Sequence, residues 1–173
     1  MKLSKNVENV LNKQINAEFW SAYMYLSMAA WFEARGLKGF ANWMRVQFQE
    51  ETAHALKLND FVLSRSGEVK LQPIAAVPTD WKNIGEIFGE TYKHECIVTE
   101  MIYNCAEVAE KEKDRATISM LQWYVDEQTE EESNVTEILD QLKLIGEDGQ
   151  AIYHLDKELA TRAFVDPTLT PAP

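Results

Sequence analysis

Apolar residues recur three and four positions apart along four long segments of the chain, which is the pattern of amphipathic α-helices. Few glycines or prolines interrupt these segments, so an all-β fold built from short strands is not expected. The helices are expected over Ser4–Ala34, Lys38–Ser64, Trp81–Lys111 and Asp114–Ile145. A shorter apolar repeat predicts a fifth helix within Gln150–Ala163. The remaining residues, Val165–Pro173, form a proline-rich tail that is expected to be irregular.

The ends of these helices carry residues that commonly begin or end a helix. Ser4 and Asp80 are suited to cap the first and third helices, because their side chains can accept hydrogen bonds from free backbone amides. Gly36, Gly67 and Gly146 follow the expected ends of the first, second and fourth helices.

The lengths of the connections predict the topology. The first and second helices, like the third and fourth, are joined by only a few residues and should be antiparallel neighbours. The segment Gly67–Thr79 is longer and contains Pro73 and Pro78. If extended, it spans about 43 Å, which matches the length of about 42 Å of a 28-residue helix. The predicted fold over residues 1–164 is one all-α domain: a four-helix bundle with a long crossover between helices two and three and a short fifth C-terminal helix.

Composition and charge narrow the possible functions. The 173 residues include 17 Lys and Arg against 28 Asp and Glu, which gives a net charge of −11. A content of 46% hydrophobic residues is too high for a disordered acidic chain. The negative charge disfavours nucleic acids and anionic membranes as partners and favours cations.

Two further features bear on the cellular compartment. The N-terminus lacks an apolar signal segment and no run of about 18 apolar residues is present, so a cytoplasmic protein is expected. Cys96 and Cys105 lie nine residues apart on one predicted helix. That spacing separates them by about 13 Å, too far for a disulfide, so reduced, buried thiols are expected.

Each of the four apolar stripes is interrupted near its midpoint by polar residues. The interrupting residues, in chain order, are Glu18, Glu51, His54, Glu95, Gln128 and Glu131. On any one helix, such a residue could equally be a surface charge in a slightly different helical register. On all four helices together, the coincidence favours a shared point inside the bundle. Four buried carboxylates would cost several kcal/mol each or become protonated unless cations balance them, and two divalent ions would do so.

The types and spacing of these residues favour iron or manganese. Carboxylates with one imidazole suit those metals better than thiolate-rich structural zinc sites do. One Glu from each of two helices, with a pair at i, i+3 from each of the other two, is the di-iron arrangement of bundle proteins. The pairs here are Glu51-x-x-His54 and Gln128-x-x-Glu131. Because Gln128 supplies an uncharged amide, one metal is expected to bind tightly and the other to be labile.

Three runs of sequence resemble those of bacterial non-haem ferritins, and the resemblance extends from about Ser4 to Phe164. They are residues 47–54 (QFQEETAH), 90–95 (ETYKHE) and 122–128 (QWYVDEQ). The resemblance implies a ferritin-like fold and a shell of 24 subunits. It also implies that Fe(II) is oxidised by dioxygen or peroxide at a centre inside each subunit and is stored as a ferric mineral.

The family's motifs also imply roles for individual residues. Glu18, Glu51, His54 and Glu95 would surround the first iron; Glu51, Glu95, Gln128 and Glu131 would serve the second, with Glu51 as the bridge. Tyr25 matches a tyrosine that hydrogen-bonds near the centre and can supply an electron, although a core aromatic residue would look the same. Trp123 matches a tryptophan near the centre, although for a Trp in a helix core, packing is the better default explanation.

Three further acids match a third iron site of bacterial ferritins. They are Glu50, Glu127 and Glu130. The residues alone favour a solvated acidic face, whereas the resemblance favours the iron site. The chain departs from haem-binding relatives at Thr52 and at Gln128-x-x-Glu131, so no haem is expected. It also has Ile118 and Leu121 where animal ferritins place the acids of a three-fold channel.

Other classes of protein fit parts of the pattern. A di-iron oxygenase or peroxidase would share the centre but would need a substrate pocket or an electron-delivering partner. A DNA-protecting mini-ferritin would lack the fifth helix, and a metal-free scaffold would have to bury the acids at a high energetic cost.

Overall fold

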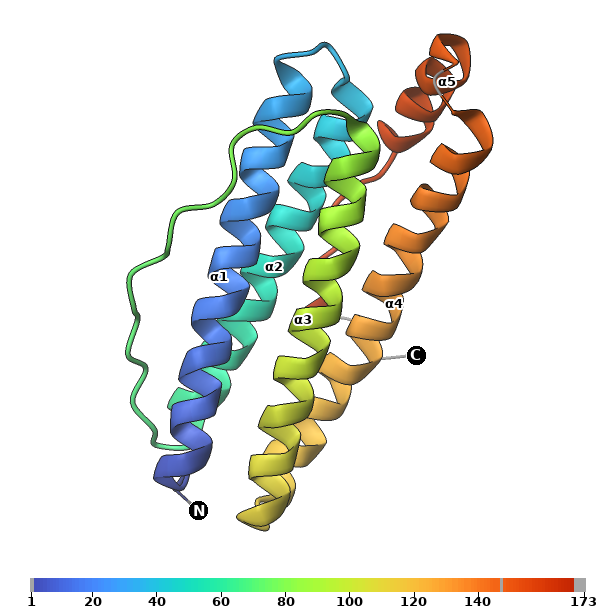
Figure 1. Ribbon diagram of the computed structural model, residues 1–173. Helices are drawn as coiled ribbons and strands as arrows, with labels where there is room; N and C mark the ends of the chain where they lie inside the picture. Colours follow the sequence, from blue (N-terminus) through green and yellow to red (C-terminus); the bar gives the residue numbers. More distant parts are fainter. Residues whose placement is uncertain (1, 147, 170–173) are drawn as a thin grey trace.

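Five α-helices and one 3-10 turn make up the computed structural model, which describes residues 2–146 and 148–169. The elements are α1 (Lys5–Glu33), α2 (Lys38–Ser64), α3 (Ile84–Lys111), α4 (Arg115–Ile145), α5 (Gly149–Leu159) and the 3-10 helix η1 (Pro167–Leu169). Helices α1 to α4 form an elongated bundle, and α5 lies at one end of it (Figure 1). The predicted fold class, a four-helix bundle with a short fifth helix, is confirmed.

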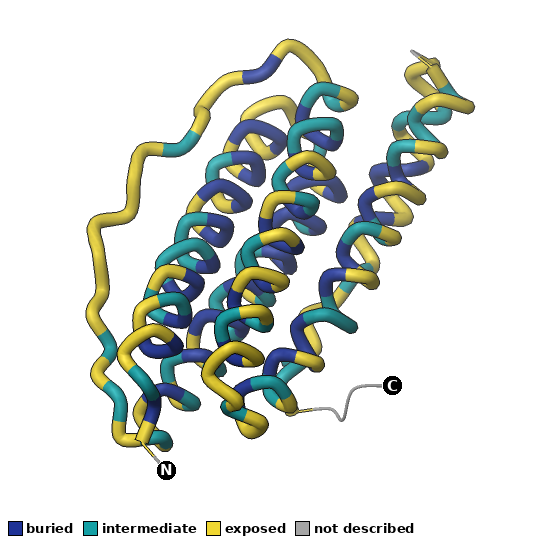
Figure 2. Tube along the Cα trace, turned by 60° about the horizontal axis from the view of Figure 1, so that its bottom comes forward, coloured by how far each residue is buried: buried dark blue, intermediate teal, exposed yellow. Residues whose placement is uncertain are grey.

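The crossover between α2 and α3 runs along the outside of the bundle from one end to the other (Figure 1). It is mostly exposed along its length (Figure 2). Two side chains of α1 hold it in place: the Asn12 amide donates to the Glu68 carbonyl at 2.9 Å, and the Ser27 hydroxyl donates to the Pro78 carbonyl at 2.7 Å. The long connection therefore leaves α2 and α3 parallel, as its length predicted.

The start of α3 differs from the sequence prediction. The helix begins at Ile84, and its cap is Asn83, whose Oδ1 accepts from the Glu86 amide at 2.8 Å. The expected cap, Asp80, instead accepts from the Trp31 indole and from the Trp81 amide, both at 3.0 Å. Burying Trp81 against Trp31 takes the chain through a turn first, so the prediction of a helix beginning at Trp81 with Asp80 as its cap was wrong.

Helix α2 is capped by a residue from α5. Its own Leu37 makes no side-chain capping bond. The carboxylate Oδ1 of Asp156 accepts from the backbone amides of Gly39 at 2.7 Å and Phe40 at 3.1 Å. A Cβ at Gly39 would lie 1.5 Å from the Asp156 carbonyl oxygen, so only glycine permits this approach. The α5 backbone therefore packs directly against the start of α2.

The end of α5 is also fixed by α2. The helix ends at Leu159, four residues before the predicted limit of Ala163. The Asn42 amide donates to the carbonyl oxygens of Leu159 at 3.2 Å and Arg162 at 2.8 Å. These bonds satisfy carbonyls at the helix end and turn the chain away from α5.

The hydrophobic core has two halves with a polar layer between them. One half contains large apolar side chains such as Phe32 and Phe40, and the other contains residues such as Leu11 and Leu58. The residues between these halves on each helix include the polar positions that interrupt the predicted stripes. The core thus positions a buried polar layer near the middle of the bundle.

Some remaining expectations are met only in part. Both cysteines are free thiols, but Cys105 alone is buried and Cys96 is half-buried, so the prediction of two buried thiols was wrong for Cys96. The tail expected to be irregular contains the turn η1, and its last residues, 170–173, lie outside the described residues. Across the described ranges, no helix is both long enough and apolar enough to cross a membrane.

Candidate metal centre

All six residues that interrupt the predicted stripes lie in the buried polar layer. Glu18, Glu51, His54 and Glu95 are 1% exposed, Gln128 is 4% exposed and Glu131 is 5% exposed. Each of the four bundle helices contributes at least one of them. The alternative that they are displaced surface charges is therefore not supported by their burial.

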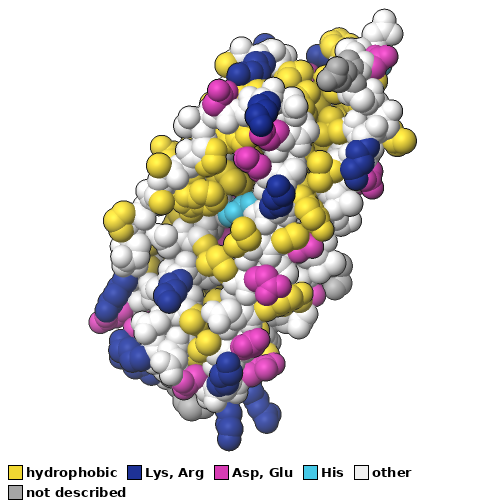
Figure 3. Space-filling model, in the orientation of Figure 1, with side chains coloured by type: hydrophobic (Ala, Val, Ile, Leu, Met, Phe, Trp, Pro, Cys, Tyr) yellow, Lys and Arg dark blue, Asp and Glu magenta, His cyan; other side chains and the backbone are white. Residues whose placement is uncertain are grey.

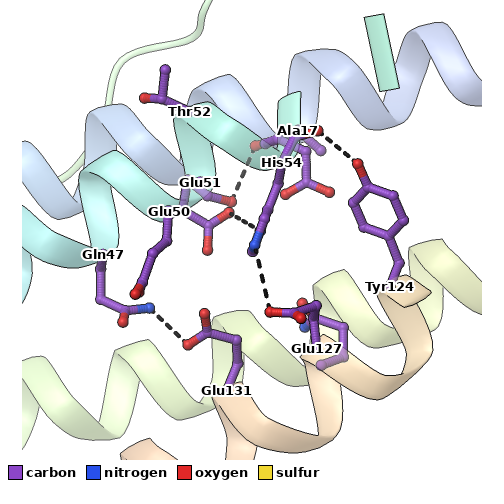
Figure 4. Close-up of polar contacts among 12 residues, drawn as sticks. Ala17, Gln47, Glu50, Glu51, Thr52, His54, Tyr124, Glu127 and Glu131 are labelled. Carbon is purple, nitrogen blue, oxygen red and sulfur yellow. Dashed lines mark hydrogen bonds and ion pairs between the residues drawn. The ribbon is translucent and has the colours of Figure 1, made fainter. Parts of the chain in front are cut away.

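Glu18, Glu51 and His54 form the tightest group within this layer. One potential ligand atom from each lies within 4.8 Å of the other two, so the three could hold one metal ion. The His54 Nδ1 atom is 3.9 Å from a carboxylate oxygen of Glu51, as Figure 4 shows. The backbone of His54 is held by the Tyr124 hydroxyl, which donates to its carbonyl oxygen at 2.7 Å. Two helices thus bring two carboxylates and one imidazole to a single point.

Glu95 lies beside this group and is held by hydrogen-bond donors of the protein. The hydroxyl of Tyr25 donates to one carboxylate oxygen of Glu95. The Gln128 amide nitrogen donates to the other oxygen at 3.2 Å and to the Thr99 hydroxyl at 3.3 Å. To bind an ion, Gln128 would use its amide oxygen.

Glu131, on α4, is held in a similar way by a side chain of α2. The Gln47 amide donates to its carboxylate at 2.8 Å (Figure 4). Glu95 and Glu131 therefore accept hydrogen bonds from amide side chains, as Glu18 does from Gln14 at 2.9 Å, whereas Glu51 lies against the imidazole. Amide donors of the protein therefore face carboxylates in both halves of the layer.

Several acceptor atoms in the layer are buried without a hydrogen-bond partner among the described residues. They are Glu18 Oε2, Gln47 Oε1 and His54 Nε2. Buried acceptors of this kind are uncommon in folded proteins and point to a bound cation or water. The donor set is five oxygen-bearing side chains and one imidazole, which fits iron.

Burial sets the protonation of these groups. It raises the pKa of Glu51 well above its usual value, and the charges of Glu95 and Glu18 raise it further. Burial and the charge of Glu131 raise the pKa of Glu95 to about 8. Burial also lowers the pKa of His54 to about 4, so its imidazole is neutral and free to bind a metal at neutral pH. The layer therefore takes up protons unless metal ions replace them.

The raised carboxyl pKa values predict that the metal-free protein loses stability as the pH rises from 6.5 to 8.5. In this range the folded state holds a proton on Glu95 that the unfolded state, with a pKa near 4.5, does not. Each such proton removes about 2 kcal/mol of stability over 1.5 pH units, or about 4–8 °C in the unfolding temperature. His54 acts in the opposite direction but adds only about 0.4 kcal/mol of stability over this range, because no more than half of its unfolded-state imidazole is protonated at pH 6.5.

Differential scanning calorimetry in the presence of a chelator would measure this dependence. The Glu95→Gln variant, which has no proton to lose at this position, is expected to show a shallower slope. An unfolding temperature that is flat or rises between pH 6.5 and 8.5 would contradict the assigned protonation.

The three acids expected to form a third iron site have different surroundings. Glu127 is half-buried, and one of its carboxylate oxygens is 4.0 Å from His54 Nε2 (Figure 4). Glu50 forms an ion pair of 2.7 Å with Arg162, and Glu130 is exposed. Burial raises the pKa of Glu50 to about 8 and that of Glu127 to about 7. These acids therefore lie next to the buried layer, and Glu50 is already paired with the positively charged side chain of Arg162.

Sequence reasoning missed several residues around the centre. Gln14 donates to Glu18 at 2.9 Å, and its position one turn away on the same stripe was a signal that could have indicated this. The Ser21 hydroxyl and His94 Nε2, on the helices that carry Glu18 and Glu95, are 2.7 Å apart. Arg162 comes from beyond α5, and nothing in its local sequence indicates that it reaches Glu50.

A bundle of four long helices with a buried layer of acids, an amide and an imidazole defines the class of ferritin-like carboxylate proteins. The family model described as a ferritin-like domain matches residues 8–145. The chain therefore belongs to the ferritin family.

Individual relatives agree with this assignment. The bacterial non-heme ferritin of Bacteroides fragilis strain 638R is 39% identical over 160 residues, which cover 92% of this chain and 99% of that protein. The one from Staphylococcus haemolyticus is 41% identical over 162 residues, covering 94% and 98%. The resemblance to bacterial non-haem ferritins is confirmed.

Solved structures extend the likeness to an archaeal protein. A structure of the novel open pore ferritin from Archaeoglobus fulgidus superposes with a TM-score of 0.92 and 51% sequence identity, covering 93% of this chain and 98% of that one. A closed form of the same ferritin, engineered by site-directed mutagenesis, gives a TM-score of 0.93 at 51% identity, with 95% and 100% coverage.

Proposed function

We propose that this protein binds two Fe(II) ions in the middle of its bundle, oxidises them with dioxygen or peroxide and stores the product as a ferric mineral. Iron storage with ferroxidase activity is the general function of ferritins. The observation that carries the proposal for this chain is the group of Glu18, Glu51 and His54, whose ligand atoms lie within 4.8 Å of one another in a buried layer.

The first iron is bound by this group together with Glu95, and the second by Glu51, Glu95, Gln128 and Glu131. Glu51 bridges the two ions. The second ion is the more labile, because the neutral amide of Gln128 is a weaker ligand than the imidazole that completes the first position. The tighter position has the unpartnered Glu18 oxygen and the neutral imidazole.

Carboxylate ligands favour oxidation because they stabilise Fe(III) more than Fe(II). Each of two Fe(II) ions gives up one electron. Dioxygen that takes up two electrons and two protons becomes hydrogen peroxide, and peroxide that takes up two electrons and two protons becomes water. The side chains of the layer hold the two ions side by side, so that both electrons leave together.

A mineral product requires that the oxidised ions leave the centre. Glu50, Glu127 and Glu130 offer an acidic route and a third iron site beside the layer, and Glu127 lies close to His54. Haem has no part in the proposal, because Thr52 and Gln128-x-x-Glu131 depart from the haem-binding pattern.

The storage proposal also requires a shell, and we place the protein in a cytoplasmic assembly of 24 copies. Apolar side chains are exposed on α1 and on the crossover, among them Tyr23 (50%), Leu71 (69%) and Ile74 (47%). Figure 3 shows hydrophobic side chains spread over this side of the molecule. Such a surface suits contact with further copies of the chain.

The test is to add Fe(II) aerobically to the metal-free protein and to follow ferric absorbance together with particle size. Rapid oxidation, with the iron retained in soluble particles of 24 subunits, is expected. Oxidation without retained iron would favour a di-iron oxygenase or peroxidase, and an absence of oxidation would refute the proposal.

Replacing Tyr25 with Phe is expected to slow oxidation about tenfold, as loss of an outer hydrogen bond to a metal ligand commonly does. Burial and the charge of Glu95 raise the pKa of Tyr25 well above its usual value, so its hydroxyl remains a donor to Glu95 at neutral pH. Stopped-flow ferric absorbance would measure the change. Tyr103→Phe, on the exposed side of α3, is the control, and an unchanged rate in Tyr25→Phe would remove the assigned role.

A further inference from the structure

A hollow of about 420 Å³ lies where α2 and α4 meet the chain beyond α5. Four glutamates line it: Glu50, Glu130, Glu137 and Glu158. Arg162 lines it too and brings a positive charge among these acids. Two of the glutamates belong to the proposed third iron site, so a cation of the protein already lies where iron is proposed to pass.

The contact between Arg162 and Glu50 uses only part of the guanidinium. Its Nη2 atom donates to one carboxylate oxygen of Glu50 at 2.7 Å. Its Nη1 atom is buried and has no hydrogen-bond partner among the described residues. The guanidinium carbon lies 4.7 Å from the ring centre of Trp43. A two-pronged pair, which would hold the carboxylate more firmly, is not formed.

The backbone of Arg162 is anchored independently of its side chain. The Asn42 amide donates to the Arg162 carbonyl at 2.8 Å and to the Leu159 carbonyl at 3.2 Å. The side chain can therefore leave Glu50 while the chain after α5 stays in place. Side-chain rotation is fast and local, in contrast to movement of a whole segment.

We propose that the guanidinium of Arg162, whose backbone is fixed, occupies the cation-binding position at Glu50 and is displaced there by iron ions that leave the centre. This inference rests on the proposed function. Arg162 carries one positive charge, whereas an iron ion carries two or three and binds carboxylate oxygen directly. Iron therefore displaces the guanidinium when it is present, and the guanidinium returns when the ion has moved on.

Because of this competition, an iron ion binds at Glu50 only briefly before it moves on. A tethered competitor weakens the binding of every ion that must replace it, and so shortens its stay. Without Arg162, Glu50 and Glu130 would hold a cation more tightly and slow the transfer of iron out of the bundle. Arg162 is thus a positioning residue of the outlet and takes no part in the oxidation itself.

The experiment uses Tb(III), a trivalent ion that prefers oxygen ligands and emits light when a nearby tryptophan is excited. Because Trp43 lies against Arg162, an ion that takes the place of the guanidinium is close enough to be sensitised. Metal-free wild type, Arg162→Gln, Arg162→Lys and Glu50→Gln would be titrated, each with and without Trp43→Phe. Arg45→Gln is the matched control, since Arg45 pairs with Glu33 on the exposed surface.

Arg162→Gln is expected to tighten Tb(III) binding at the Trp43-sensitised site about tenfold, because a competing charge is lost. Arg162→Lys and Arg45→Gln should stay close to wild type, and Glu50→Gln should weaken the site. Equal affinities in wild type and Arg162→Gln would overturn the inference, as would Arg162→Lys behaving like Arg162→Gln. Fe(II) oxidation by wild type, assayed in parallel, separates the two proposals. If wild type oxidises iron normally but Arg162→Gln binds Tb(III) no more tightly than wild type does, only the role of Arg162 is refuted.

Discussion

Replacing Glu51 with Gln is expected to lower the initial rate of aerobic Fe(II) oxidation by more than about 100-fold. Changes to residues that merely support a ligand typically cost 10- to 100-fold, and Glu51 is the proposed bridge between both ions. The substitution keeps the shape of the side chain but removes a charge from a residue that is 1% exposed. Stopped-flow measurement of ferric absorbance, at two Fe(II) per chain, gives the rate.

The matched control is Glu100→Gln, which makes the same chemical change at an exposed position of α3. It should oxidise iron at the wild-type rate. Metal-free Glu51→Gln should also unfold at a temperature no lower than wild type, because one buried acid has been removed. A variant that is folded and oxidises iron normally would show that the centre does not depend on Glu51.

Replacing Gly39 with Ala is expected to lower the free energy of unfolding by about 3 kcal/mol or more, at the upper end of what overpacking costs. The added Cβ would lie 1.5 Å from the backbone carbonyl oxygen of Asp156, an atom that cannot rotate away. Helix α5 must move, and the two hydrogen bonds from the start of α2 to Asp156 are then lost. A fall of about 6–12 °C in the unfolding temperature should accompany the change.

Gly89→Ala is the control for this variant. It makes the same substitution inside α3, where the added Cβ meets no atom within 4 Å. Alanine favours a helix over glycine by about 1 kcal/mol, so this variant should be slightly more stable than wild type. Limited proteolysis should cut Gly39→Ala near α5 and leave Gly89→Ala intact. Resistance of both variants to cleavage would contradict the assigned contact.

The bundle and its buried acids could be predicted because both depend on periodicity within single helices. Glu18 and Glu95 each interrupt an apolar stripe, and a stripe position predicts burial whatever the partner helix. The long crossover could be predicted from its length alone. These features require no knowledge of which side chains meet.

The features that could not be predicted depend on contacts between distant segments. Asp80 was predicted to cap α3. Its carboxylate instead accepts a hydrogen bond from the indole of Trp31, 49 residues away, and α3 begins later. Arg162 reaches Glu50 across 112 positions. The local sequence does not indicate such pairs, because a charged side chain such as Asp80 or Arg162 could equally well be exposed to water.

The cap that α5 supplies to α2 has a consequence for how the chain matures. Gly39 and Asp156 are 117 residues apart, so during synthesis α1 and α2 leave the ribosome long before Asp156 does. Until then, the first amides of α2 have no carboxylate to bind, and the turn between the first two helices remains free to fray. A segment translated 117 residues later thus completes a helix that has already emerged.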